Sequence, residues 1–158
     1  MHRRTFTKSA LLGAAGMSML PHMAFGTPPP IHKKSLKFGM IDEDLSVLEK
    51  FKLVKSLGFH GVELDSPHQL NEDEILEAKA QTGLEIPGLV NSLHWTKPLS
   101  DPDPAVREAC TTSMIDALHQ CKKYGGTTVL LVPAVVSDQV AYDQAWERST
   151  AEIKKMLP

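Results

Sequence analysis

The 158-residue sequence predicts an α/β fold built from successive strand–helix units. Short apolar runs alternate with longer amphipathic segments from Leu36 onward. Glycines at 58, 83 and 125 follow helical segments, and the next apolar run begins a few residues after each. Strands that alternate with helices in this way form a parallel sheet with right-handed crossovers.

The composition is that of a globular protein without a strong charge bias. Hydrophobic residues make up 42% of the chain, charged residues make up 23%, and the net charge is −2 with histidine neutral. These proportions allow a buried core to form. They give no electrostatic basis for binding nucleic acid or an anionic membrane, so we expect neither as a partner.

Residues 1–26 predict a twin-arginine export signal. Residues 3–8 read Arg-Arg-Thr-Phe-Thr-Lys, and an apolar run follows over residues 10–20. That run is too short for a stable membrane span, and the small residues around position 26 suit signal cleavage. We therefore expect export to the periplasm, with an ordinary secretory signal as the alternative. Residues 27–35, which are rich in proline and lysine, predict a stiff polar linker.

The first unit pairs a strand over Lys37–Asp42 with a helix over Ser46–Leu57. Ser46 and Glu49 have the spacing of a capping box, and Gly58 follows the helix. Apolar residues recur on one helical face at Val47, Leu48, Phe51 and Val54.

The second unit has a strand over Gly61–Asp65 and a helix that Asn71 opens and Gly83 ends. The third strand is expected over Glu85–Ser92. It contains a Pro-Gly pair at residues 87–88, which is unfavourable in a central strand.

Asp103 caps the third helix, whose first residue is Pro104, and Gly125 ends it. Its expected buried stripe comprises Val106, Cys110, Met114, Ala117, Leu118 and Cys121. The two cysteines lie roughly 16 Å apart along this helix, which is too far for a disulfide within one chain.

The fourth unit begins with the longest apolar run, over Thr128–Val136. Such a run predicts a strand that is covered on both faces, with Pro133 near its end. The last helix is expected over residues 141–157, with inward side chains at Tyr142, Ala145, Trp146, Ile153 and Met156.

Two parallel architectures fit these units, a doubly wound sheet and a (β/α)8 barrel. A nucleotide-binding doubly wound sheet needs a glycine-rich turn after a strand, and the sequence has no such motif. Polar residues instead gather at or just after the carboxyl ends of the strands: Asp42, Glu63, Asp65, His68, His94, Trp95 and Lys97. This is typical of the active-site end of a TIM-type barrel, so we predict that residues 36–158 form about four βα units of one.

Four stretches resemble the sugar phosphate isomerase/epimerase family of xylose-isomerase-like TIM barrels. They are LKFGMI (36–41), LGFHGVEL (57–64), SLHWTKPLSDPDPAVRE (92–108) and YGGTTVLLVPAVV (124–136). The resemblance implies the N-terminal half of a barrel that isomerises or epimerises a sugar or sugar phosphate. It also implies metal-assisted proton transfer next to a carbonyl, with Mn, Mg, Zn or Co as the metal.

In that family the metal ligands are Glu, Asp, His and Glu on the fifth and later strands. The expected fourth helix closes this sequence, so we assign it no metal ligand and no catalytic residue. We expect a truncated enzyme, a half that pairs with a second chain, or a half that self-associates through its open sheet edges. A non-catalytic carbohydrate-binding or barrel-remnant protein is the alternative function, and a related hydrolase or lyase is a third.

The predicted substrate contacts are Glu63, His94, Trp95 and Lys97. Glu63 alternates with apolar neighbours and is expected to face the barrel interior, where it contacts substrate or forms a structural ion pair. His94 and Trp95 are expected to hydrogen-bond and stack on a sugar, or to anchor a packed loop. Lys97 is a point charge for a phosphate or a solvated side chain.

Overall fold

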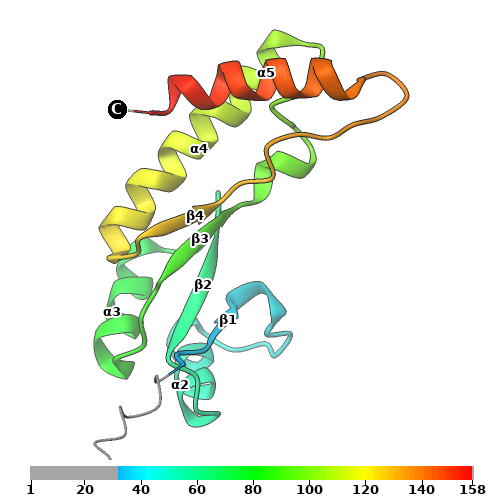
Figure 1. Ribbon diagram of the computed structural model, residues 1–158. Helices are drawn as coiled ribbons and strands as arrows, with labels where there is room; N and C mark the ends of the chain where they lie inside the picture. The colour runs from blue at the N-terminus through cyan, green and yellow to red at the C-terminus, as the bar shows by residue number, and fades with distance from the viewer. Residues whose placement is uncertain (1–31, 158) are drawn as a thin grey trace, which may run out of the picture. The chain divides into compact units, whose positions relative to one another are not determined.

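Four parallel strands form one sheet in the order β1-β2-β3-β4, so each strand pairs with its neighbours along the chain (Figure 1). The computed structural model describes residues 32–157, and the predicted export signal over 1–26 lies outside them. The strands are β1 (Ser35–Lys37), β2 (Gly61–Ser66), β3 (Gly88–Asn91) and β4 (Thr128–Leu130). The helices are α2 (Val47–Ser56), α3 (Glu72–Thr82), α4 (Pro104–Tyr124) and α5 (Tyr142–Lys155). This arrangement confirms the predicted α/β fold and fits part of a TIM barrel.

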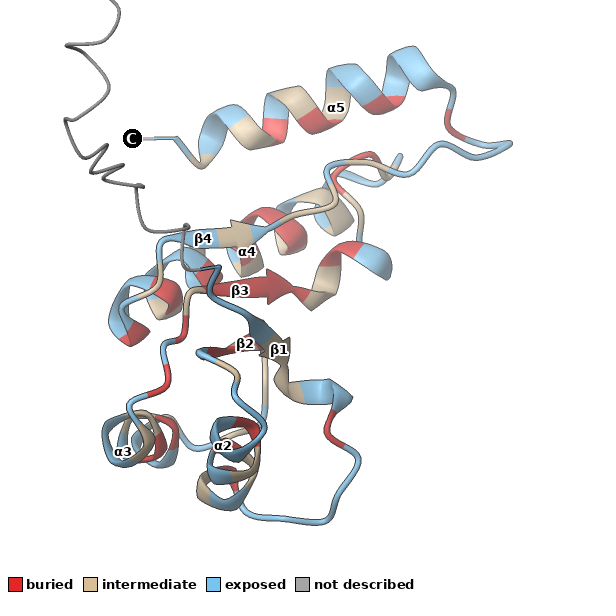
Figure 2. Cartoon of the chain, turned by 60° about the horizontal axis from the view of Figure 1, so that its bottom comes forward, coloured by how far each residue is buried: buried red, intermediate tan, exposed pale blue. Residues whose placement is uncertain are grey.

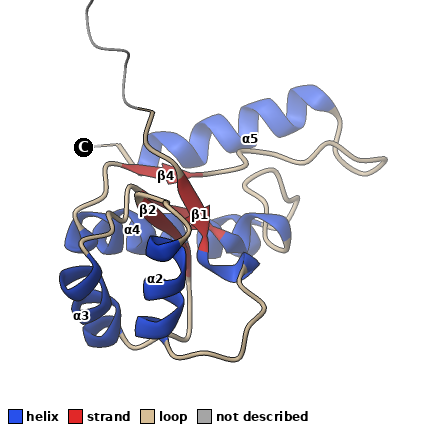
Figure 3. Ribbon diagram, turned by 90° about the horizontal axis from the view of Figure 1, so that it is seen from below, coloured by secondary structure: helices blue, strands red, loops and turns tan. Residues whose placement is uncertain are grey.

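The core lies between the helices and one face of the sheet. Strand β3 is buried along its whole length (Figure 2), and α2 and α3 lie side by side (Figure 3). Side chains that alternate along β2 and β3 meet these helices in a single apolar cluster, which includes Phe51, Val54, Val62, Leu64, Ile75 and Leu89. The opposite face of β2 therefore carries Glu63 and Asp65, as the alternation predicted.

The helix ends confirm the capping signals. Ser46 and Glu49 form both halves of the capping box, with Glu49 Oε2 accepting the Ser46 backbone N–H at 2.9 Å. Asn71 Oδ1 accepts the N–H groups at the start of α3. Gly83 and Gly125 follow their helices with φ of 66° and 81°, a left-handed conformation that favours glycine.

The first and third strands are shorter than predicted. The run expected as a strand over Lys37–Asp42 leaves the sheet after Lys37, and Phe38–Met40 form a 3-10 turn, η1. The Ile41 N–H bonds the Phe38 carbonyl at 3.1 Å, so backbone groups that a longer strand would offer to β2 are used locally. The third strand is confined to Gly88–Asn91, and η2 (Ser92–Trp95) takes up the residues after it.

The prediction that Thr128–Val136 forms a strand covered on both faces is wrong. Pairing stops at Leu130, whose side chain is 51% exposed, and Val136 is 56% exposed. β4 lies at the edge of the sheet, and Pro133 has no N–H to continue the ladder. An apolar run alone does not show whether other elements cover both faces of a strand or whether the strand lies at the edge of the sheet.

The predicted inward face of the last helix is also partly wrong. Tyr142 and Trp146 are 66% and 64% exposed, whereas Ala145, Ser149 and Glu152 are buried. Helix α5 turns Glu152 toward α4 because Arg107 and Thr111 on α4 hydrogen-bond its carboxylate. On α4, Leu118 is exposed, while Cys110 and Cys121 are buried and are not joined by a disulfide. Among the described helices, none has the length and apolar character needed to cross a membrane.

Candidate functional site

The carboxyl ends of β1, β2 and β3 meet at one edge of the sheet because the strands are parallel. A cavity of about 400 Å³ opens there, between η1 and the turn that follows β2. Its polar lining comes from Asp65, His68, Gln69 and Ser92, and its apolar lining comes from Phe38, Leu64, Pro67 and Leu70. A mainly apolar wall with a few polar groups is the usual composition of a small-molecule site.

An ion pair joins the ends of the first two strands at this edge. Lys37 Nζ lies 2.9 Å from Asp65 Oδ1, and both side chains are partly exposed. Lys37 also pairs in register with Glu63, which places three charged residues on the face of the sheet away from the helices. The register thus brings the predicted Glu63 beside a cation.

His94, in η2, is the most deeply buried of the predicted site residues. Its exposed fraction is 0%, and its Nδ1 accepts the Val132 backbone N–H at 3.2 Å. Burial, and then the positive charge of Lys37, lowers the pKa of His94 below its ordinary value. The imidazole is therefore neutral, with its proton on Nε2, and Nε2 has no hydrogen-bond partner among residues 32–157.

Trp95 and Lys97 follow His94 at the surface. The Trp95 ring is 67% exposed and meets the His94 ring edge to face, with centroids 4.9 Å apart. Lys97 is exposed and forms no ion pair within the described part of the chain. The structure therefore brings His94 and Trp95 together and leaves Lys97 free for solvent or a ligand.

The cavity itself is lined by residues other than Glu63, His94, Trp95 and Lys97. The sequence places Asp65 at the carboxyl end of the second strand and His68 just after it, which is the available signal for them. Phe38 and Gly39 were not predicted to line a site, because they fell inside an expected strand. Gly39 faces Asp65 across the cavity lining, and an added Cβ would sit 3.5 Å from Asp65 Oδ2, an ordinary van der Waals distance.

His68 connects the cavity to the buried end of α4. Its Nε2 lies 3.3 Å from Tyr124 Oη, and its Nδ1 has no partner within residues 32–157. Burial, followed by the negative charge of Glu72, raises the pKa of Tyr124 to about 12. The phenol therefore stays protonated and neutral at physiological pH.

The described residues contain no group of three or more His, Cys, Asp or Glu side chains that is arranged to hold a metal ion. Asp65 is paired with Lys37, and His68 with Tyr124, rather than with each other. The divalent metal implied by the resemblance thus lacks a fitting ligand set in this part of the chain, and we derive no step through it.

A family model described as a xylose isomerase-like TIM barrel matches residues 51–158. The chain belongs to this family. A comparison with curated proteins finds no match.

Among solved structures, D-psicose 3-epimerase in the presence of D-fructose has a TM-score of 0.62 and 20% identity, over 79% of this chain and 47% of its own. The apo 3-keto-D-glucoside 4-epimerase from E. coli has a TM-score of 0.62 and 18% identity, over 78% of this chain and 49% of its own. D-Psicose 3-epimerase with D-tagatose, from Clostridium cellulolyticum H10, has a TM-score of 0.57 and 14% identity, over 79% and 47%. The chain spans about half the length of these structures, and at such identities the likeness shows the fold.

Proposed function

We propose that this chain forms the substrate-binding part of a sugar isomerase or epimerase that acts on a free sugar or a sugar phosphate. The supporting observation is the cavity at the carboxyl ends of β1–β3, in a family whose barrels place their active sites at that end. Its carboxylate, imidazole, amide and hydroxyl groups can hydrogen-bond several sugar hydroxyls, and its apolar wall suits the C–H face of a ring.

Each predicted contact has a role in this proposal. His94 supports the site from inside the fold, because its buried ring meets the Trp95 ring edge to face and its Nδ1 accepts the Val132 N–H. The exposed ring of Trp95 stacks on the sugar, and Lys97 attracts a phosphate where the sugar carries one. Glu63 accepts a hydroxyl hydrogen bond from the same face of the sheet.

The whole reaction is proton transfer at the carbon next to a carbonyl. The described residues contribute binding and orientation to it, through hydrogen bonds and stacking at the strand ends. We assign the proton-transfer groups to no residue of this chain.

A calorimetric titration of the full chain with D-fructose and with D-tagatose tests this proposal. We expect saturable binding that His94→Gln weakens at least about tenfold, because the variant loses the buried ring against which Trp95 packs. His119→Gln is the matched control, since His119 lies exposed on α4. Absence of binding by the unmodified chain contradicts the proposal.

The same samples, incubated in D₂O with Mn²⁺, separate catalysis from binding. Solvent deuterium incorporated next to the sugar carbonyl supports an isomerase or epimerase. Binding without deuterium incorporation is the result that a substrate-binding part without its proton-transfer groups gives, and the non-catalytic carbohydrate-binding alternative gives the same result.

We also propose that residues 1–26 direct export to the periplasm by the twin-arginine route. The proposal rests on the Arg3-Arg4 pair and the short apolar run that follows it. Replacing both arginines with lysine should retain the chain in the cytoplasm, as measured by cell fractionation. Unchanged export of this variant would point to an ordinary secretory signal.

A further inference from the structure

The loop between η2 and α4, residues 96–103, carries Lys97 and directly follows Trp95. Its middle is anchored unusually deeply for a surface connection, since Leu99 and Ser100 are 0% and 1% exposed. Such burial requires partners for the backbone groups that are taken out of water.

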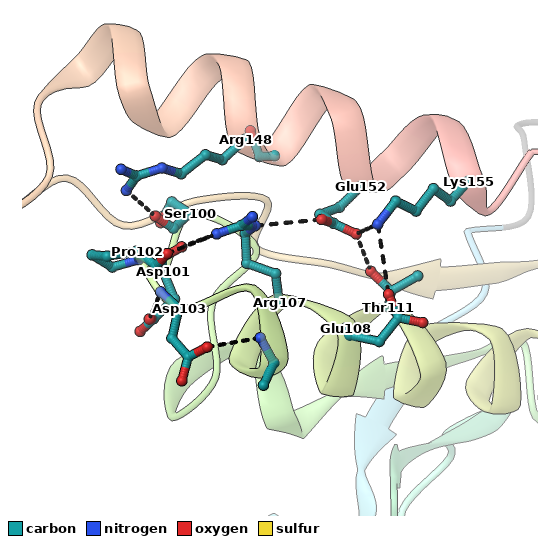
Figure 4. Close-up of polar contacts among 12 residues, drawn as sticks. Ser100, Asp101, Pro102, Asp103, Arg107, Glu108, Thr111, Arg148, Glu152 and Lys155 are labelled. Atoms are coloured by element: carbon teal, nitrogen blue, oxygen red, sulfur yellow. Dashed lines mark hydrogen bonds and ion pairs between the residues drawn. The ribbon is translucent and has the colours of Figure 1, made fainter.

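Two arginines from two different helices supply those partners (Figure 4). Arg107 Nη1, on α4, donates to the carbonyl oxygens of Asp101 and Pro102 at 2.7 and 3.0 Å. Arg148 Nη1, on α5, donates to the Ser100 carbonyl oxygen at 3.1 Å. Three consecutive loop carbonyls thus accept hydrogen bonds from charged donors, which are stronger than neutral ones.

Ser100 also ties the loop to the segment that follows β4. Its Oγ donates to the Val135 carbonyl at 2.9 Å and accepts the Val135 N–H at 2.8 Å. The loop is therefore held by α4, α5 and the chain after β4 together.

Arg107 is itself fixed by a buried carboxylate. Its Nε lies 3.3 Å from Glu152 Oε1, and Glu152 Oε2 accepts from Thr111 Oγ1 at 3.0 Å and from Lys155 Nζ at 2.7 Å (Figure 4). Burial raises the pKa of Glu152, but hydrogen bonds from Lys155, Thr111 and Arg107 outweigh it and hold that pKa below its ordinary value. Glu152 therefore stays ionised and keeps the Arg107 guanidinium in place.

A buried ion pair adds little net stability compared with apolar residues of the same size, so stability alone does not explain this network. Its directional hydrogen bonds converge on one loop, which directly follows Trp95 and carries Lys97. We propose that Arg107, Arg148 and Glu152 are positioning residues that hold loop 96–103, and through it Trp95 and Lys97, in place for a sugar. This inference rests on the proposed function.

We call the contacts of Arg107, Arg148 and Glu152 that hold loop 96–103 the clamp. Arg148→Met in the full chain tests it, because Arg148 is half-buried and its removal leaves Glu152 paired with Arg107. Lys154→Met is the matched control, since Lys154 is exposed on the same helix and forms no hydrogen bond or ion pair with the rest of residues 32–157. Both changes are made in a Trp146→Phe background. That background leaves Trp95 as the single tryptophan, because the chain has two tryptophans, Trp95 and Trp146.

The first measurement is amide hydrogen exchange of peptides that cover residues 96–103. We expect Arg148→Met to speed exchange there roughly tenfold, the effect of losing one hydrogen bond to a charged group, while α2 and β2 stay unchanged. Unchanged exchange in the loop overturns the clamp. Faster exchange throughout the chain also overturns it, since the role is then general stability.

The second measurement is D-fructose binding, followed by Trp95 fluorescence. We expect binding about tenfold weaker for Arg148→Met and unchanged for Lys154→Met, with Arg148→Lys restoring part of the loss. Faster hydrogen exchange in loop 96–103 together with unchanged D-fructose affinity overturns the positioning role. If the parent protein does not bind D-fructose, the proposed sugar function fails for this ligand, and the exchange data still decide whether the clamp exists.

Discussion

The Val132 backbone N–H donates a 3.2 Å hydrogen bond to Nδ1 of His94, so a residue just past β4 sets the tautomer of the side chain that follows β3. The imidazole proton is thereby assigned to Nε2. The fourth unit thus determines the chemistry of a group that belongs to the third.

Acid is expected to destabilise the protein more than it destabilises a His94→Gln variant. Burial lowers the pKa of His94 in the folded chain, so below about pH 6.5 the unfolded chain binds a proton that the folded chain does not. The free energy of unfolding therefore falls as the pH drops from about 6.5 toward the lowered folded value. Unfolding midpoints at several pH values measure this, and equal pH dependence of the two proteins would contradict it.

Asp65→Asn is expected to weaken D-fructose binding roughly tenfold, because the cavity loses a charged acceptor and Lys37 loses its partner. Asp73→Asn is the control, since Asp73 lies at the start of α3 outside the cavity lining. Calorimetric titration distinguishes the two variants. Equal affinities would remove Asp65 from the site.

Ser46→Ala is expected to lower the free energy of unfolding by about 1 kcal/mol, the usual cost of losing an N-cap. The variant removes the acceptor for the Glu49 N–H and half of the capping box of α2. Ser56→Ala, at the other end of the helix, should cost less. Urea denaturation measures both changes, and the ranking fails if Ser56→Ala costs more.

Chain 27–158, expressed alone, is expected to self-associate through its exposed apolar surface. Leu130 on β4 and Trp146 on α5 are 51% and 64% exposed, and an open strand edge is a template for pairing. Changing both residues to lysine should shift the sedimentation profile toward monomer. Leu57→Lys is the control, because Leu57 is 61% exposed next to α2. A sharp monomeric profile of the unmodified chain would refute this expectation.

Features encoded by neighbouring residues were predictable from the sequence. The capping box at Ser46, the Asn71 cap and the left-handed Gly125 depend on residues within one helical turn of each other. The alternation around Glu63 was likewise predictable, because Val62 and Leu64 needed burial and the strand period left no other arrangement.

Features decided by tertiary partners were not predictable. Trp146 was predicted to be a core residue, yet it is exposed and Glu152 is buried instead. Glu152 faces inward because it bonds with Arg107 and Thr111 on α4, more than 40 residues earlier in the chain. The cavity was missed in part for a similar reason, since Phe38 enters its lining only because β1 ends early. Neither the pairing of Glu152 with α4 nor the entry of Phe38 into the cavity lining leaves a local pattern in the sequence.

The strict order of the sheet bears on how this chain is made. Within residues 32–157, each strand after β1 pairs with the strand translated just before it, so the units leave the ribosome in the order in which their strands pair. None of these four strands needs a later segment in order to pair with the strand before it, so the nascent chain can gain structure unit by unit. The Val132 contact to His94 can then form only after β4 has been made, and the imidazole acquires its fixed tautomer only when synthesis has passed the fourth strand.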